Sequence, residues 1–271
     1  MCSFNAPMNT INLCDNQVLH YLSHLRSSAY KLEMDLEQAQ YIADGGDGAV
    51  PPDTQDYFKT VVTPILRDTL ARVPPVEELS TSGGLYAFGA LDRASGISSV
   101  YNRALYMPEY PELPHSDDYF GEGGKDVAGV TARWLTASPR LVVVDDLLSP
   151  KALLEVRRLL AESTVFYQTK MPEKFGGYVG AYIDDGLHQR LLLGLSFALH
   201  KQYPLIFKRH DLRYMWAYKY APGMGGIKIH ADEAAVNVNI WITPDDANVN
   251  PNSGGLVVFT AKPKQGWDFK K

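Results

Sequence analysis

A run of alternating residues near the C-terminal end most strongly constrains the fold of this chain. In the segment 236–243 a β-branched apolar residue occupies every second position, a period of two that predicts a strand. An aromatic-rich strand is expected before it at 212–220, and Pro and Gly residues at 222–226 predict a tight turn between the two strands. A polar loop at 244–252, Gly254-Gly255 and an apolar run at 256–259 follow. This order is typical of an antiparallel jelly roll.

A His-x-Asp pair lies just before the alternating run. His230 and Asp232 could donate one imidazole nitrogen and one carboxylate oxygen to the same metal ion. With a second His, such a pair forms the 2-His-1-carboxylate set of non-haem Fe(II), which leaves coordination positions open. The motif alone is weak, and a hydrogen-bonded structural histidine is the competing interpretation.

A second copy of the motif shows how much the context matters. His115 and Asp117 follow a proline-rich stretch, and residues before prolines favour extended, turn-like conformations. We therefore expect the second copy to lie in a surface loop and to bind no metal.

The block from Leu141 to Phe259 resembles 2-oxoglutarate- and Fe(II)-dependent oxygenases of the prolyl-hydroxylase-like superfamily. The resemblance rests on the order of its pieces: Leu141-Val-Val-Val-Asp-Asp-Leu-Leu-Ser-Pro, Tyr220-Ala-Pro-Gly, His230-Ala-Asp232, Asn239-Ile-Trp-Ile-Thr-Pro and Ser253-Gly-Gly-Leu. It covers about half of the chain and implies an α+β protein with a double-stranded β-helix, or jelly roll. It also implies Fe(II), with 2-oxoglutarate as co-substrate and ascorbate as a possible reductant, and hydroxylation as the usual reaction.

Two further residues are candidates for binding the co-substrate. The resemblance places a pocket tyrosine at Tyr220, whose phenol could hydrogen-bond a carboxylate. The alternative is a tyrosine that only packs within its strand. Asn239 shares its predicted strand face with Asn237 and Trp241, which suggests a polar cavity. If that face points outward, Asn239 is solvated instead.

The chain departs from the family pattern after Asp232. The family continues with a distal His ligand and then an Arg or Lys for the far carboxylate of 2-oxoglutarate, but no His and no Arg follows Asp232 here. We therefore expect a jelly roll that is incomplete at its C-terminal end. We also expect these 271 residues alone not to turn over 2-oxoglutarate.

The rest of the chain predicts a helical and irregular N-terminal region, 1–138, before the oxygenase-like domain, 139–271. An apolar stripe predicts a helix from about Asp15 to Ala43, and a second helix is expected at 53–72, kinked or split by Pro64. Segment 73–138 is predicted to be irregular, with short strands near Leu85. We also expect a strand at 141–144, a helix capped by Ser149, a strand near 178–183 and a helix from 184 or 185 to 200.

Composition excludes several classes of protein. A net charge of -5 and a pI near 5.8 argue against a nucleic-acid-binding surface. No apolar run approaches the length of a membrane span, and the first residues lack the pattern of a signal peptide. The two cysteines, Cys2 and Cys14, form no disulfide framework, so we expect an intracellular protein of the cytoplasm.

A second function remains open from the sequence. The chain could be a non-catalytic jelly-roll or helical scaffold that binds a partner. The substrate, whether a protein side chain, a peptide or a small molecule, is not indicated, and neither is the oligomeric state.

Overall fold

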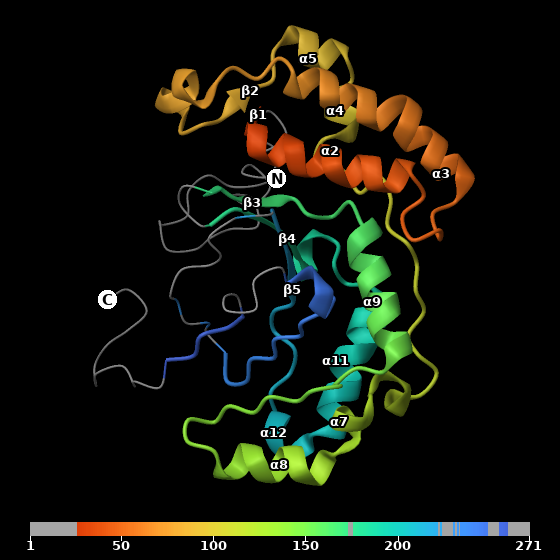
Figure 1. Cartoon of the computed structure of the whole chain (residues 1–271), viewed down its shortest axis with the longest axis vertical. Helices are drawn as coiled ribbons and strands as arrows, with labels where there is room; N and C mark the ends of the chain where they lie inside the picture. Colours follow the sequence, from red (N-terminus) through yellow and green to blue (C-terminus); the bar gives the residue numbers. More distant parts are fainter. Residues whose placement is uncertain are drawn as a thin grey trace, which may run out of the picture. The chain divides into compact units, whose positions relative to one another are not determined.

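The structure is a computed structural model that describes residues 26–172, 176–221, 223, 230, 232, 234–248 and 255–259 (Figure 1). Helices combine with small antiparallel sheets, which confirms the α+β class. The chain forms two compact units, each assembled from separate stretches. The first unit comprises 1–112, 158–194 and 212–233, and the second comprises 113–157, 195–211 and 234–271.

The first unit begins with the two-residue strand β1 (Arg26–Ser27) and the helix α2 (Ala29–Ala43). The Ser28 side chain accepts a hydrogen bond of 3.1 Å from the Lys31 N–H and so caps α2. The prediction of one helix from Asp15 to Ala43 is therefore wrong at 26–28, because these residues pair with β2 and form the cap. The stretch 15–25 lies outside the described residues.

Helices α3 (Pro52–Tyr57) and α4 (Thr63–Leu70) are joined by the π-helical turn η1 (Phe58–Val62). The predicted disturbance at Pro64 is confirmed, because Pro64 has no N–H and the wider turn lies immediately before it. Apolar residues of α2, η1 and α4 form one core: Leu32, Ala39, Ile42, Phe58, Val62 and Leu66.

Short elements complete the helical part of the first unit. They are the 3₁₀ helix η2 (Val76–Ser82), strand β2 (Tyr86–Ala87) and helices α5 (Ala90–Ala94) and α6 (Ile97–Val100). Strand β2 pairs antiparallel with β1, as expected for a short strand near Leu85. The buried carboxylate of Asp92 holds this region, because it accepts hydrogen bonds from Arg72 and Tyr86.

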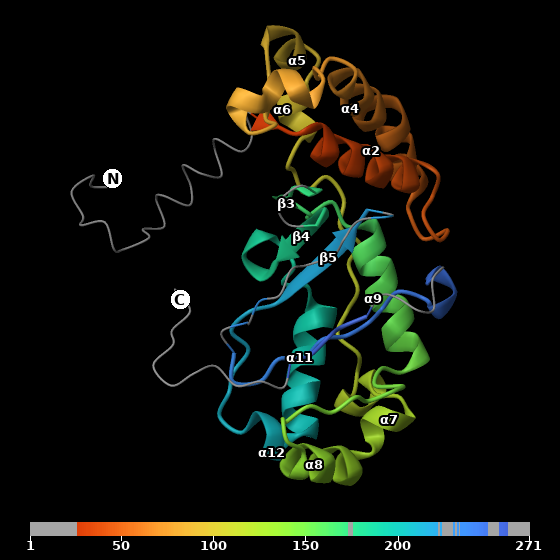
Figure 2. The ribbon, with the colours of Figure 1, turned by 60° about the vertical axis from the view of Figure 1, so that its left-hand side comes forward.

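A three-stranded antiparallel sheet belongs to the same unit, in the order β3 (Gln168–Lys170), β4 (Tyr178–Tyr182), β5 (Trp216–Tyr220). Figure 2 shows the three strands side by side. Tyr178 pairs with Tyr220 and Tyr182 pairs with Trp216, so these four aromatic residues share one face of the sheet. The strands expected near 178–183 and 212–220 are both present, with β5 shorter than expected.

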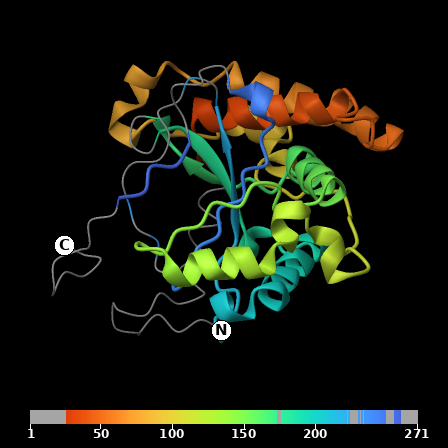
Figure 3. The same ribbon diagram turned by 60° about the horizontal axis from the view of Figure 1, so that its bottom comes forward.

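The second unit contains η3 (Ser116–Tyr119), α7 (Glu122–Lys125), α8 (Val127–Thr136), α12 (Pro204–Phe207) and η5 (Asp245–Ala247), with parts of α9 (Pro150–Glu162) and α11 (Arg190–Gln202). Figure 3 shows α8 and α12 next to each other. The predicted cap of α9 is confirmed, since the Ser149 side chain accepts from the Ala152 N–H at 3.2 Å. The helix expected from 184 or 185 begins later, at Arg190, because the turn η4 (Ile183–Asp185) precedes it.

Three predicted strands are absent from the described residues. Segments 141–144 and 234–243 have no strand assignment, and Val143 and Trp241 are largely exposed, at 76% and 65%. The described segment 255–259 also forms no strand. An alternating run becomes a strand only when a neighbouring strand accepts its backbone hydrogen bonds, and these segments have no such neighbour among the described residues.

In the described part of the chain, every helix is too short or too polar to cross a membrane.

Candidate functional site

Strand β5 organises the candidate site because its aromatic residues alternate with small or charged ones. Trp216, Tyr218 and Tyr220 lie on one face of the strand, with Tyr178 and Tyr182 of β4 beside them. The ring centroids of Tyr178 lie 4.7 Å from Tyr218 and 5.3 Å from Tyr220. We call these five residues the aromatic face.

Gly180 makes room for this packing. It pairs with Tyr218 across the strands, and a Cβ atom there would lie 3.2 Å from the Tyr218 ring and 3.0 Å from the Tyr182 ring. The absence of a side chain at Gly180 therefore lets two tyrosine rings approach each other over the middle of β4.

His230 and Asp232 follow β5 in the chain, and their side chains lie together. His230 Nε2 is 3.5 Å from Asp232 Oδ1, and the side chains are 51% and 30% exposed. The sequence prediction that the pair can act together is consistent with this distance. Both groups are accessible to an ion from solvent.

A pair of tyrosines links the aromatic face to Asp232. The hydroxyl oxygens of Tyr182 and Tyr218 lie 3.4 Å apart. Burial, then the hydrogen bond with Tyr182, raises the pKa of Tyr218, and the negative charge of Asp232 raises it further. Asp232 therefore lies within electrostatic range of the Tyr218 phenol. Sequence reasoning missed Tyr182 and Tyr218, although the alternation 216, 218, 220 contained the signal.

Tyr220, the predicted co-substrate residue, is at the end of β5. Its ring packs against Tyr178, and the residue is 44% exposed. Burial raises the pKa of Tyr220, with a smaller contribution from Tyr178. Tyr220 therefore packs within the sheet, as the alternative to a co-substrate role predicts, but part of its side chain is still exposed to solvent.

Asn239 lies in the segment 234–243, which forms no strand, and it is exposed. The shared face with Asn237 and Trp241 was predicted from that strand, which the structure does not form in this segment. Gly254, expected at a corner of the jelly roll, lies outside the described residues.

The residues that the structure describes offer no third metal ligand next to the pair. Among the residues that the structure describes, no three His, Cys, Asp or Glu side chains converge in a way that could hold a metal ion. His115, in the second copy of the motif, is exposed beside the short turn η3, as expected for a loop.

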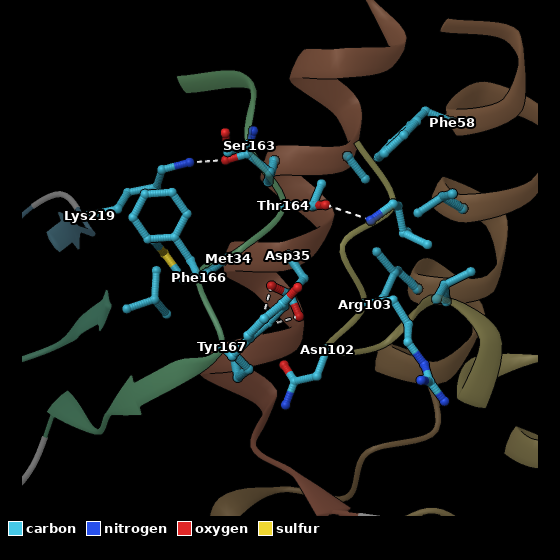
Figure 4. A pocket seen from close by; sticks show the side chains of 18 residues that line it. Met34, Asp35, Phe58, Asn102, Arg103, Ser163, Thr164, Phe166, Tyr167 and Lys219 are labelled. Carbon is cyan, nitrogen blue, oxygen red and sulfur yellow. Dashed lines mark hydrogen bonds and ion pairs between the residues drawn. The ribbon is translucent and has the colours of Figure 1, made fainter. Parts of the chain in front are cut away.

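A cavity lies on the opposite face of the sheet from Tyr218, in the first unit. It holds about 40 Å³, more than the ~15 Å³ that one water needs. Figure 4 shows Lys219 and Phe166 on one side of it and Asn102 and Arg103 on another. The Asn102 Oδ1 atom is buried and accepts no hydrogen bond from the described residues.

Lys219 is a buried cation at this cavity. Its ammonium donates a hydrogen bond to Gln38 Oε1 of α2 and lies 4.9 Å from the centre of the Phe166 ring. Burial lowers the pKa of Lys219 to about 8, although Asp35 and Glu37 oppose the shift. Asp35 itself is ion-paired with Lys31, one turn earlier on α2. This arrangement anchors β5 to α2.

Comparisons of the chain with protein-family models, with curated proteins and with solved structures find no match, so the site rests on its own geometry.

Proposed function

We propose that the chain belongs to a 2-oxoglutarate- and Fe(II)-dependent dioxygenase whose metal ligands include His230 and Asp232. The 3.5 Å between His230 Nε2 and Asp232 Oδ1 carries this proposal. Two donor atoms about 2.1 Å from one divalent metal and at right angles to each other lie about 3 Å apart. A small rotation of either exposed side chain is enough to reach that separation.

The two donor groups, the His230 imidazole and the Asp232 carboxylate, are of the types that Fe(II) binds. Fe(II) in oxygenases takes a mixed set of imidazole nitrogen and carboxylate oxygen and keeps positions open for other ligands. With Fe(II) bound, the chemistry supplied is hydroxylation, in which R–H, dioxygen and 2-oxoglutarate yield R–OH, succinate and carbon dioxide. The protein positions the reactants and limits the access of water.

The aromatic face supports the rest of the proposal. Tyr220 and the Tyr182–Tyr218 pair offer phenol groups on the sheet whose last strand precedes His230, and a phenol can donate a hydrogen bond to a carboxylate. We propose that this sheet is part of a double-stranded β-helix, and that Tyr220 and Asn239 contribute to the co-substrate pocket as the resemblance implies.

Metal binding is the first test. Calorimetric titration with Mn(II), a redox-inert substitute for Fe(II), should give saturable binding to the wild-type chain. His230→Ala and Asp232→Ala should each remove it, because each deletes a ligand. His115→Ala is the matched control, since it changes the same residue type in the second His-x-Asp copy. Equal binding by wild type and His230→Ala would refute the metal site and favour the non-catalytic scaffold.

Co-substrate binding is the second test. In the presence of Mn(II), 2-oxoglutarate should bind to the wild-type chain and bind more weakly to Tyr220→Phe, which lacks only the hydroxyl. Unchanged binding would leave Tyr220 as a packing residue. Succinate formation with Fe(II) and ascorbate, compared between wild type and Asp232→Ala, tests turnover itself.

A further inference from the structure

A loop rich in glycine and aspartate follows α2 and lies against the end of α9. Its sequence is Asp44-Gly-Gly-Asp-Gly, and its glycines have φ values of 95°, 54° and 85°. A Cβ atom on Gly46 would lie 3.0 Å from Glu162 Oε1, so the backbone of the loop directly covers this carboxylate. Gln38 of α2 also donates a hydrogen bond to the Ala161 carbonyl.

Glu162 is a buried carboxylate with unmet hydrogen-bonding capacity. The residue is 0% exposed, and neither carboxylate oxygen accepts a hydrogen bond of ordinary geometry from the described residues. Burial raises the pKa of Glu162, and so does the charge of Asp47, while Arg158 and the Asp47 N–H oppose the rise. A buried carboxylate whose oxygens lack well-formed hydrogen bonds is costly, and such a group calls for an explanation such as a bound ion.

Asp47 and Tyr41 contribute further oxygen atoms near the Glu162 carboxylate. The Tyr41 hydroxyl donates a hydrogen bond of 3.0 Å to Asp47 Oδ1. Burial and this bond raise the pKa of Tyr41 to about 12, and the charge of Glu162 adds to the rise. The carboxylates of Asp47 and Glu162 therefore act on the same tyrosine.

The backbone adds negative potential around these carboxylates. Helix α2 ends at Ala43 and α9 ends at Glu162, and the C-terminal end of a helix carries a partial negative charge. The carbonyls of Asp44, Gly46 and Asp47 accept no backbone hydrogen bond from the described part of the chain. Arg158 is the opposing charge, and its buried Nε atom also finds no acceptor among the described residues.

We propose that the 44–48 loop and Glu162 form a binding site for a calcium ion, independent of His230 and Asp232. The carboxylates of Glu162 and Asp47 would be the charged ligands, and loop carbonyls and waters would complete the shell. Ca²⁺ takes six to eight oxygen ligands of mixed type in flexible geometry, which suits two carboxylates beside exposed carbonyls. Mg²⁺ requires a more regular shell and retains more of its waters.

Terbium luminescence tests this proposal on the full chain, because Tb³⁺ occupies calcium sites and a nearby tyrosine, here Tyr41, sensitises its emission. We expect saturable emission that Ca²⁺ displaces, and an increase in Tm when Ca²⁺ is added. Glu162→Gln and Asp47→Asn should each weaken Ca²⁺ binding by roughly tenfold or more, because affinity follows the charge of the ligands. Glu33→Gln, an exposed carboxylate on α2, is the matched control and should bind as the wild type does.

Three outcomes would overturn the proposal. The first is Tb³⁺ emission from the wild type that added Ca²⁺ does not reduce. The second is an equal Ca²⁺ affinity in Asp47→Asn and in the wild type. The third is a Glu162→Gln variant that is more stable than the wild type, together with a wild-type Tm that Ca²⁺ does not change. The last result would identify Glu162 as a strained partner of Arg158 only. If Glu162→Gln does not fold, Asp47→Asn decides alone, since Asp47 is exposed. A His230→Ala chain should keep its Ca²⁺ response, which separates this site from the proposed iron site.

Discussion

The ammonium of Lys219, on β5, donates a hydrogen bond to Gln38 Oε1, on α2, and joins two elements that lie 181 positions apart in the sequence. Gln38 in turn donates to the Ala161 carbonyl at the end of α9. One glutamine therefore satisfies groups from a strand and from a helix. The region around α2 is part of the core of the first unit rather than an appendage to the sheet.

Lys219 should make stability depend on pH. Its pKa is lowered to about 8 from 10.5, so between these values the unfolded chain binds a proton that the folded chain has lost. The free energy of unfolding should therefore rise with pH over this window, relative to Lys219→Met. Urea unfolding from pH 7 to 10.5 measures the difference. Lys59→Met, at an exposed lysine, is the control, and its free energy of unfolding should change with pH as that of the wild type does. The same pH dependence in Lys219→Met and in the wild type would contradict the prediction.

Asp232→Asn should lower the pKa of Tyr218, because the charge of Asp232 is one cause of its elevation. The Tyr218 ring signal in an alkaline NMR titration, assigned with Tyr218→Phe, would shift at lower pH in the variant. Asp117→Asn, in the second His-x-Asp copy, should leave that signal unchanged. An unchanged Tyr218 titration in Asp232→Asn would show that Asp232 does not act on the aromatic face.

Gly180→Ala should disturb the aromatic face. The added Cβ would lie 3.0 Å from the Tyr182 ring and 3.2 Å from the Tyr218 ring, so the rings must move. Overpacking of this kind costs about 1–3 kcal/mol. Chemical denaturation and near-ultraviolet circular dichroism report the loss of stability and the altered tyrosine environment. Gly89→Ala, where the nearest atom is 3.6 Å away, is the control, and an equal effect in both variants would argue against ring crowding.

Leu32→Ala should destabilise the first unit by about 2–5 kcal/mol, the usual range for removing a buried leucine side chain. Leu32 is 0% exposed in the core formed by α2, η1 and α4. Leu91→Ala, at a residue that is 72% exposed, should change stability little. Equal unfolding midpoints for the two variants would show that α2 does not pack as the structure has it.

Local signals in the sequence predicted several elements well. Ser149-Pro150 marks the start of α9 because serine caps a helix and proline suits its first turn. Pro64 marks the disturbance in the second helix for a similarly local reason, the missing N–H. The placement of His230 beside Asp232 also followed from spacing alone, since two residues on either side of one position remain close in any extended backbone.

Tertiary structure decided what local signals leave open. The alternation in 234–243 predicted a strand, but a strand also needs a partner for its backbone groups, and sequence patterns do not specify that partner. The burial of Lys219 and Glu162 was also unpredictable, because charged side chains are usually exposed. Lys219 is covered by α2, and Glu162 by the loop that follows α2. Local sequence signals therefore determined features such as the start of α9 and the disturbance at Pro64, while long-range packing determined which predicted strands formed and which charged side chains became buried.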